Sequence, residues 1–275
     1  MAKSLDLAFD RAGELGCTTF QLFTRNPRVW KFKPLSDDQV TLFRDKRRRT
    51  DFRYLVDHMP YLPNLASSEK EIKKKSRETL DEEVRRCDAL GLDYLVVHLG
   101  SHGGKGTVTG MRNIAGAVRH ALEGSDGKTV VLLENMAGQR NCVGARFEEL
   151  RGILDLIDAE RRTGICLDTC HVYAAGFDLA SAQAVDAALG LFNELVGMKE
   201  LRVVHLNDSK GALGSHLDRH DHIGMGRIGP AGLRAILAYE GVLDRPIIME
   251  TPIDDVCGQE DDFKLVRKLL PDKKS

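Results

Sequence analysis

The chain has 275 residues, of which 42% are hydrophobic, so it is long enough to bury a substantial core in one large or two small domains. Its 40 Lys and Arg residues nearly balance its 41 Asp and Glu residues, which excludes a uniformly basic nucleic-acid-coating protein but leaves room for a local basic patch. The six cysteines form no CxxC pair, no apolar run approaches the roughly 18 residues of a membrane helix, and no signal-peptide pattern opens the chain. We therefore expect a cytoplasmic protein that does not engage the membrane.

In chain order, the sequence first predicts a helix over residues 4–16, with no strand before it. Seven short apolar runs follow, at 19–23, 54–59, 94–100, 130–135, 164–170, 202–207 and 246–251. Their unbroken apolarity is typical of parallel strands covered on both faces. Helix-like segments lie between them, at 67–92, 110–125, 146–164, 181–197 and 229–241. The first of these is expected to begin at serine caps and to end at Gly91. The alternation, without a Pro/Ser-rich linker, predicts a single α/β domain over residues 1–275.

Six of the apolar runs carry a residue that can bind a metal ion at or near the C-terminal end. These residues, spaced 34 to 45 positions apart, are His58, His98, Glu134, Asp168, His205 and Glu250. In an open doubly wound sheet, only the strands beside a switch point share a ligand site. In a closed (β/α)8 barrel, the C-terminal ends of all strands face one mouth. The pattern therefore predicts an α/β TIM barrel, with seven strands visible and the first strand apparently missing from this chain.

A single histidine or carboxylate after a strand is more often a hydrogen-bonded residue or a helix cap than a metal ligand. Six of them at one barrel mouth are different, because buried ionisable groups that face one another are destabilising unless they are paired or metallated. His171, Asp218 and His220 bring the candidates to nine, which are five His, two Asp and two Glu. Nine ligands predict two or three ions, and nitrogen and carboxylate donors suit Zn²⁺, with Mn²⁺ or Fe²⁺ as alternatives.

Local spacing refines these expectations. Asp168 should end its strand with His171 past the following turn, an offset that favours neighbouring metals over one shared ion. Asp218 and His220 are two residues apart, so in an extended loop their side chains point to the same side. With His171 they would form a three-ligand metal site with an open position. We expect His220 as the ligand, although a slip of the loop by two residues would place His222 there instead.

The motifs around these residues resemble those of the endonuclease IV family, the zinc-dependent apurinic/apyrimidinic endonucleases of DNA repair. The resemblance extends from about residue 5 to 270, in family order, through "HMPYLPNLAS" at 58–67, "VVHLGSH" at 96–102, "LENMAG" at 133–138, "LDTCH" at 167–171, "HLNDSKGALGSHLDRHDHIG" at 205–224 and "METP" at 249–252. Family members usually begin with a strand of the type GxHVSxAGG, which this chain lacks. No metal ligand comes from that segment.

The resemblance implies a TIM barrel with three zinc ions. The first zinc would be bound by His58 and His98, with Glu134 bridging the first and second ions. The second would be completed by Asp168, His205 and Glu250, and the third held by His171, Asp218 and His220. The implied reaction is hydrolysis of the phosphodiester 5′ to an abasic site in double-stranded DNA, with 3′-end phosphodiesterase activity, by a metal-held hydroxide that Glu134 orients. A monomer is the expectation for this family.

DNA contacts are expected from the loops. Arg28 and Trp30 lie in a loop that combines basic and aromatic residues and also contains Arg25, although Trp30 equally fits a packed ring. Tyr61 and Leu62 resemble family residues that enter the DNA near the lesion. An abasic nucleotide is easier to flip out than a paired base, which favours selection of damage.

Two other functions remain as alternatives. A metal-dependent sugar isomerase or epimerase uses the same barrel with one or two ions, so counting the metals separates it from the nuclease. A DNA-damage-binding protein without catalysis is the other alternative, and the complete ligand set argues against it.

Overall fold

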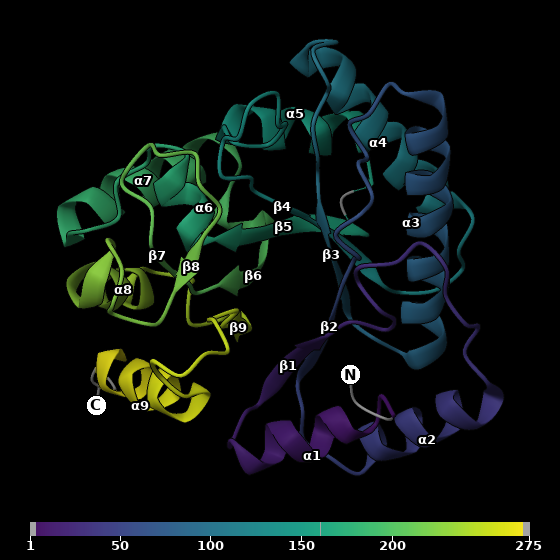
Figure 1. The fold of residues 1–275 in the computed structure, drawn as a ribbon, viewed down its shortest axis with the longest axis horizontal. Helices are drawn as coiled ribbons and strands as arrows, with labels where there is room; N and C mark the ends of the chain where they lie inside the picture. The colour runs from purple at the N-terminus through teal and green to yellow at the C-terminus, as the bar shows by residue number, and fades with distance from the viewer. Residues whose placement is uncertain (1–3, 160, 272–275) are drawn as a thin grey trace. The chain divides into compact units, whose positions relative to one another are not determined.

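The computed structural model describes residues 4–159 and 161–271. The chain divides into two compact units, one formed by Met1–Leu133 with Gly152–Gly164 and the other by Glu134–Arg151 with Ile165–Ser275. Strands of the main sheet follow the order β1-β2-β3-β4-β5-β6-β9, so neighbours in the sheet are also neighbours along the chain (Figure 1). Among the described residues this sheet has seven strands, and no strand precedes the first helix.

The first unit alternates helices and strands. Its elements are α1 (Leu7–Glu14), β1 (Thr19–Leu22), α2 (Asp37–Arg48), β2 (Tyr54–His58), α3 (Lys70–Leu90), β3 (Tyr94–His98), α4 (Thr107–Glu123) and most of β4 (Val130–Glu134). Strand β2 is parallel to both β1 and β3, with Thr19 opposite Tyr54 and Val56 opposite Tyr94. Helices α3 and α4 lie side by side (Figure 1).

Local sequence explains the ends of the helices in this unit. Ser36 caps α2 through a capping box with Gln39, in which each side chain accepts a hydrogen bond from the other residue's backbone N–H. Helix α3 ends as predicted at Gly91, whose φ of 75° is left-handed and suits a residue without Cβ. The predicted serine caps of α3 are wrong, because Glu69 precedes the helix and makes no side-chain capping bond.

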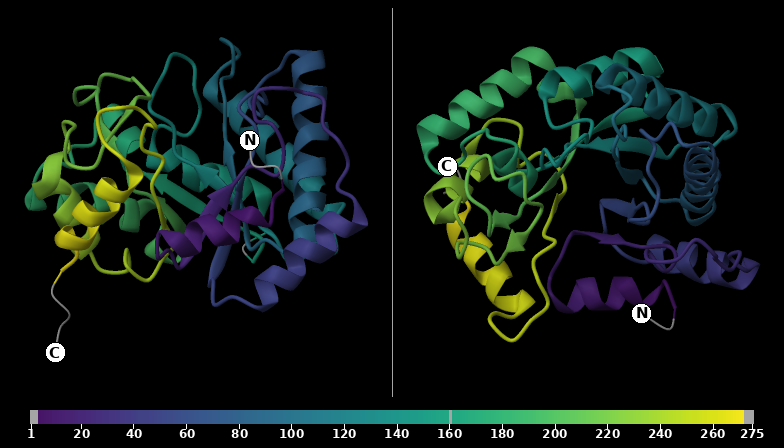
Figure 2. Two further views of the ribbon diagram at one scale, coloured as in Figure 1. Left: turned by 60° about the horizontal axis from the view of Figure 1, so that its bottom comes forward. Right: turned by 45° about the horizontal axis from the view of Figure 1, so that its top comes forward.

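The rest of the chain continues the alternation through the second unit. Its elements, in chain order, are the first part of α5 (Phe147–Ile157), most of β5 (Thr163–Asp168), α6 (Thr169–Ala174), α7 (Ala182–Leu195), η1 (Met198–Glu200), β6 (Leu201–His205), β7 (Asp208–Ser209), β8 (His220–Asp221), α8 (Gly229–Ala238), β9 (Ile247–Ile248) and α9 (Gln259–Leu269). Strand β6 is parallel to β5 and β9, while β7 and β8 form a short antiparallel pair. Helices α7 and α8 lie side by side (Figures 1 and 2).

All seven observed strands of the main sheet are shorter than the predicted runs, as two of them illustrate. The run at 164–170 stops being a strand at Asp168, because α6 begins at once with Thr169. The run at 246–251 contributes only Ile247 and Ile248 to the sheet. The centres of the strands are apolar and buried, which places the hydrophobic core along the sheet. Within the residues described, no helix has the length and apolarity needed to cross a bilayer.

Candidate metal centre

Five of the predicted ligands are the last residues of consecutive strands. His58, His98, Glu134, Asp168 and His205 close β2, β3, β4, β5 and β6. Glu250, the sixth, lies two residues beyond β9. All of these except His98 and Glu250 are buried. Strands β2 and β3 of the first unit are parallel, as are β5 and β6 of the second, so each delivers one donor group at its C-terminal end.

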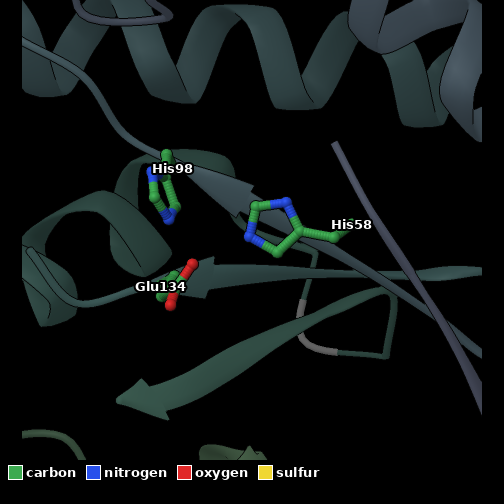
Figure 3. A group of neighbouring side chains, drawn as sticks. All are labelled: His58, His98 and Glu134. Carbon is green, nitrogen blue, oxygen red and sulfur yellow. The ribbon is translucent and has the colours of Figure 1, made fainter. Parts of the chain in front are cut away.

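The first histidine pair lies at the ends of β2 and β3. The rings of His58 and His98 meet edge to face, with centroids 5.0 Å apart. Nδ1 of His58 lies 2.7 Å from the carbonyl oxygen of Met59. Because a carbonyl only accepts hydrogen bonds, Nδ1 carries the proton and Nε2 presents its lone pair. Figure 3 shows both rings at the ends of their strands, together with the carboxylate of Glu134 at the end of β4.

A second group surrounds His205. Its Nδ1 lies 2.9 Å from Oε1 of Glu134 and 3.2 Å from Oε2 of Glu250. Asp168 is opposite His205 in the β5–β6 pair, and its Oδ2 lies 3.9 Å from Nδ1 of His205. Burial by itself lowers the pKa of His205, but interactions with Cys166, Glu250 and Glu134 outweigh it and raise the pKa well above its usual range. One proton on Nδ1 cannot hydrogen-bond all of these carboxylates well, so the geometry favours a divalent cation in its place.

A third group joins α6 to the loop between β7 and β8. His171 donates from Nδ1 to the carbonyl oxygen of Asn135 at 2.8 Å and places Nε2 3.1 Å from Oδ1 of Asp218. His220 has the same arrangement, with Nδ1 3.1 Å from the carbonyl oxygen of Glu250 and Nε2 3.5 Å from Asp218. Among the described residues, the buried Nε2 of His220 makes no hydrogen bond. Both rings are therefore oriented by backbone carbonyls with Nε2 facing a carboxylate, as metal-binding histidines are.

Charge supports the same interpretation. Burial lowers the pKa of His171, but Asp168, Asp218 and Glu134 outweigh it and raise the pKa to about 10. Without a metal ion, a proton on Nε2 of His171 therefore lies between the imidazole and the carboxylate of Asp218. A metal ion competes for this place, because it binds the neutral ring and displaces the proton. The residues present thus fit a divalent metal.

Asp168 ends β5 as predicted, but the segment that follows it differs from the expected one. The sequence predicts a turn between Asp168 and His171, and that prediction is wrong. Asp168 is the N-cap of α6, and its Oδ1 accepts a hydrogen bond from the backbone N–H of His171 at 2.8 Å. Its Oδ2 accepts from Nδ2 of Asn207 at 2.6 Å. The cap therefore holds the carboxylate and the imidazole in one rigid helical turn.

Sequence reasoning missed the asparagines that orient the ligands. Asn135 accepts a hydrogen bond on Oδ1 from the backbone N–H of Asp168 at 2.7 Å, and its Nδ2 donates back to the carbonyl of Asp168. Asn207 accepts on Oδ1 from the N–H of Glu250 at 2.8 Å while it donates to Asp168. The available signal was position, since each asparagine lies one or two residues after a strand-final ligand.

Two cysteines are near ligand-type side chains but are poor metal ligands. Cys166 lies in a group with Glu134 and His205, and Cys170 lies near His220. Burial raises the pKa of each thiol to about 12. A thiol must lose its proton to bind metal strongly, so nitrogen and oxygen remain the donors of this centre.

His222 is not an alternative to His220. Its Nδ1 lies 2.9 Å from Asp262 and its Nε2 lies 3.0 Å from Asp254, while His220 faces Asp218. The structure therefore brings His220, as expected, to the third group of ligands.

The residues predicted to contact DNA differ in their exposure. Arg28 is exposed, and the side chains of Tyr61 and Leu62 are 54% and 38% exposed. Trp30 is half-buried, with Nζ of Lys75 6.0 Å from the centre of its ring. DNA contact by these four residues therefore stays a prediction.

Arg25, in the same loop as Arg28, is not available to a ligand. It is buried and its Nε lies 2.5 Å from Oε1 of Glu83. The loop that carries Arg28 and Trp30 therefore uses the Arg25 side chain for an internal ion pair, and the expectation that Arg25 contacts DNA is wrong.

The chain is similar to a known family model, to curated proteins and to solved structures. Residues 9–271 match the family model described as xylose isomerase-like TIM barrel. The chain is 48% identical to a probable endonuclease 4 of Methanoculleus marisnigri, over 98% of this chain and 96% of that protein. The crystal structure of endonuclease IV from Thermus thermophilus superposes with a TM-score of 0.85 at 36% identity, covering 98% of this chain and 95% of that one.

The chain belongs to the endonuclease IV family.

The endonuclease IV match confirms the predicted fold class, a TIM barrel, whose main sheet has seven strands within the described residues. The structure of a D-tagatose 3-epimerase-like protein also superposes, with a TM-score of 0.70 over 97% of this chain and 92% of that one. At 20% identity this likeness shows the shared fold alone. Membership of the endonuclease IV family implies bound metal ions, and the described residues offer matching groups of donors.

Proposed function

We propose that this chain is a DNA-repair nuclease that hydrolyses the phosphodiester bond 5′ to abasic sites in duplex DNA, with 3′-end phosphodiesterase activity. The observation that carries the proposal is the shared arrangement of three histidines. His58, His171 and His220 are each held through Nδ1 by a backbone carbonyl, which aims Nε2 of each as a ligand. The family membership supports the reaction class.

The nine side chains divide naturally among three zinc ions. We assign His58 and His98 to the first ion and Glu134 to a bridging position between the first and second. The second ion takes Asp168, His205 and Glu250, and the third takes His171, Asp218 and His220. Within the second unit, the contacts of 2.9–3.5 Å between ring nitrogens and carboxylates support the latter two groups. Mn²⁺ is compatible with the same donors at part of the centre.

When bound, the zinc ions supply a nucleophile at neutral pH and neutralise charge on the phosphate and the leaving oxygen. Glu134 is the catalytic residue from the protein, because its position between two sets of ligands allows it to orient the attacking group. Asn207 and Asn135 keep Asp168 in place during this reaction through the hydrogen bonds described above. The four carboxylates carry four negative charges against six from three Zn²⁺ ions, which leaves the centre positive and attractive to a phosphate.

Duplex DNA reaches this centre through exposed loops. Tyr61 follows the ligand His58 by three residues and packs its ring against Phe23, with centroids 5.3 Å apart. The Tyr61 ring is exposed on one side and held by Phe23 on the other, so it can fill the space that a flipped nucleotide leaves in the duplex. The neighbouring Leu62 adds apolar surface to this contact. Arg28 would contact the phosphate backbone and Trp30 would stack. We expect the protein to act as a cytoplasmic monomer and as one domain over residues 1–275.

A cleavage assay tests the proposed function. The substrate is a duplex with one tetrahydrofuran site, compared with the same duplex without the lesion. Zinc-loaded protein should cut 5′ to the tetrahydrofuran and leave the undamaged duplex intact. Glu134→Gln should abolish cleavage, whereas Glu148→Gln, an exposed carboxylate on α5, should not change it. Tyr61→Ala should weaken binding to the damaged duplex with unchanged zinc content. Zinc-loaded protein that leaves the damaged duplex uncut would refute the proposal.

A further inference from the structure

A separate group of ligand-type side chains lies outside the nine residues of the proposed centre. His222 directly follows β8, and Asp262 lies in the first turn of α9. Asp254 and Cys257 belong to the loop between β9 and α9. Three residues, from the loop after β9 and from α9, thus converge on the imidazole of His222.

His222 is enclosed by two carboxylates. Its Nδ1 lies 2.9 Å from Oδ2 of Asp262, and its Nε2 lies 3.0 Å from Oδ1 of Asp254. The other oxygen of Asp262 accepts a hydrogen bond from the backbone N–H of Ile223 at 2.9 Å, which fixes this carboxylate against the ring. His222 and Asp262 are each only 1% exposed. Ionised carboxylates accept but do not donate, so each ring nitrogen needs a proton or a metal ion between it and its carboxylate.

Cys257 adds a sulfur donor to this group. One ligand atom from each of His222, Cys257 and Asp262 lies within 4.8 Å of the other two. A thiol beside an imidazole and carboxylates is a donor set that selects Zn²⁺. A carboxylate on the far nitrogen of a zinc-bound histidine commonly orients its ring, which is the position of Asp254 on Nε2. Nδ1, on the side of Asp262, is then the ligating nitrogen.

We propose that a further Zn²⁺ ion binds Nδ1 of His222, Sγ of Cys257 and the carboxylate of Asp262, while Asp254 holds the ring through Nε2. On binding, the thiol of Cys257 and Nδ1 of His222 each release any proton they carry to solvent. The ion joins the loop before α9 to a residue two positions beyond His220. Its role is structural, because it anchors the segment that carries Asp218 and His220.

Cobalt substitution tests this site independently of nuclease activity. The nine-residue centre has only nitrogen and oxygen donors, so a thiolate-to-cobalt charge-transfer band in the near ultraviolet reports the new site. The full chain is stripped with a chelator and reloaded with Co²⁺. We expect the wild type to show the band. Cys257→Ser should lose the band and should bind one Co²⁺ ion fewer per chain. Cys142→Ser, a half-buried cysteine elsewhere, is the matched control and should keep both.

Two further variants keep the test decisive. Cys170→Ser should retain the band, because Cys170 lies near the nine-residue centre. Asp254→Asn, at a side chain that is 35% exposed and tolerant of substitution, should weaken Co²⁺ binding at this site by about tenfold or more. A folded wild type without the band, or a band that survives Cys257→Ser, overturns the proposal. In that case His222 is held by protons alone, and the nuclease proposal is unaffected.

Discussion

Two regions in which the protein buries ionisable side chains neutralise them differently. In the first unit, Glu83 forms an ion pair with Arg25 and accepts a hydrogen bond from Thr24, and Arg86 donates to Thr24 and to the carbonyl of Lys33. Arginine keeps its charge at every physiological pH, so this group contains its own cations. The candidate metal centre surrounds its carboxylates with imidazoles, whose lone pairs are available to an added cation.

The difference distinguishes a structural group of charges from a functional one. A group with permanent cations is complete when the chain folds, and any loss of a partner leaves an unpaired buried charge. A group of carboxylates and histidines is complete only with protons or metal ions, and it exchanges one for the other. Four predictions follow from this comparison, ordered by the size of the expected effect.

Metal removal should affect the candidate centre most strongly. We expect a chelated protein to lose cleavage of abasic duplex entirely. It should also lose about 4 kcal/mol of stability for each ion previously held at about 1,000 times its Kd, because bound ions stabilise only the folded state. Urea unfolding with and without chelator measures this change. The same free energy of unfolding in both conditions would contradict the account.

Breaking the arginine-containing group should destabilise the protein without changing its metal content. Glu83→Gln removes the charge that pairs with Arg25, and we expect a loss of about 3 kcal/mol in the free energy of unfolding. Burial first, and then the negative charge of Glu83, raise the pKa of Asp57. Removing the charge of Glu83 also removes its repulsion of Asp57, so the loss of stability should lie at the low end for a buried pair. Glu78→Gln, exposed on the same helix, should change stability by less than about 0.5 kcal/mol. Zinc lost along with stability in Glu83→Gln would show that the two regions are not independent.

The pH dependence of stability should differ between metal-free and zinc-loaded protein. The pKa of His171 is raised from 6.5 to about 10 in the metal-free fold, so its protonation stabilises that fold fully below pH 6.5. This contribution should decline as pH rises toward 10. Unfolding of the chelated protein across this range measures the decline, with His171→Asn expected to reduce it. Zinc occupies the place of the proton, so a loaded protein should not show the His171-dependent part of the decline.

The smallest effect should come from an orienting residue. Asn207→Ala removes the hydrogen bond to Oδ2 of Asp168 and the acceptor for the N–H of Glu250. We expect about a 10- to 100-fold loss of metal affinity or activity, as for other residues that orient ligands. Gln183→Ala, exposed on α7, serves as the control and should leave both unchanged. Unaltered zinc affinity and activity in Asn207→Ala would exclude this orienting role.

The sequence predicts the strand ends well because of their periodicity. Short Val- and Leu-rich runs allow few structures other than buried parallel strands, and polar residues at regular intervals mark where they end. His58, Glu134 and His205 could therefore be placed at strand ends from the residue pattern alone. Asp168 was also placed correctly at the end of its strand, but the turn predicted after it was wrong, because no strong signal separates the end of β5 from the start of α6.

Contacts between distant residues could not be predicted in the same way. Arg25 is buried because Glu83, far along the chain, supplies its partner. His222 contacts Asp254 and Asp262, which follow it by 32 and 40 residues, instead of joining the candidate metal centre. In one sequence alone, nothing indicates which of many carboxylates will pair with a given cation. Only the packing of the fold decides these partners.

The most direct test of the central claim is a crystal structure of the zinc-loaded protein with anomalous scattering measured at the zinc edge. The account predicts three peaks among the nine ligands, with Glu134 between two of them and the third beside Nε2 of His171 and His220. A peak beside Cys257 would be additional and would bear only on the further site. A protein that cleaves abasic duplex but shows one peak or none among these nine residues, at full zinc loading, would contradict the account.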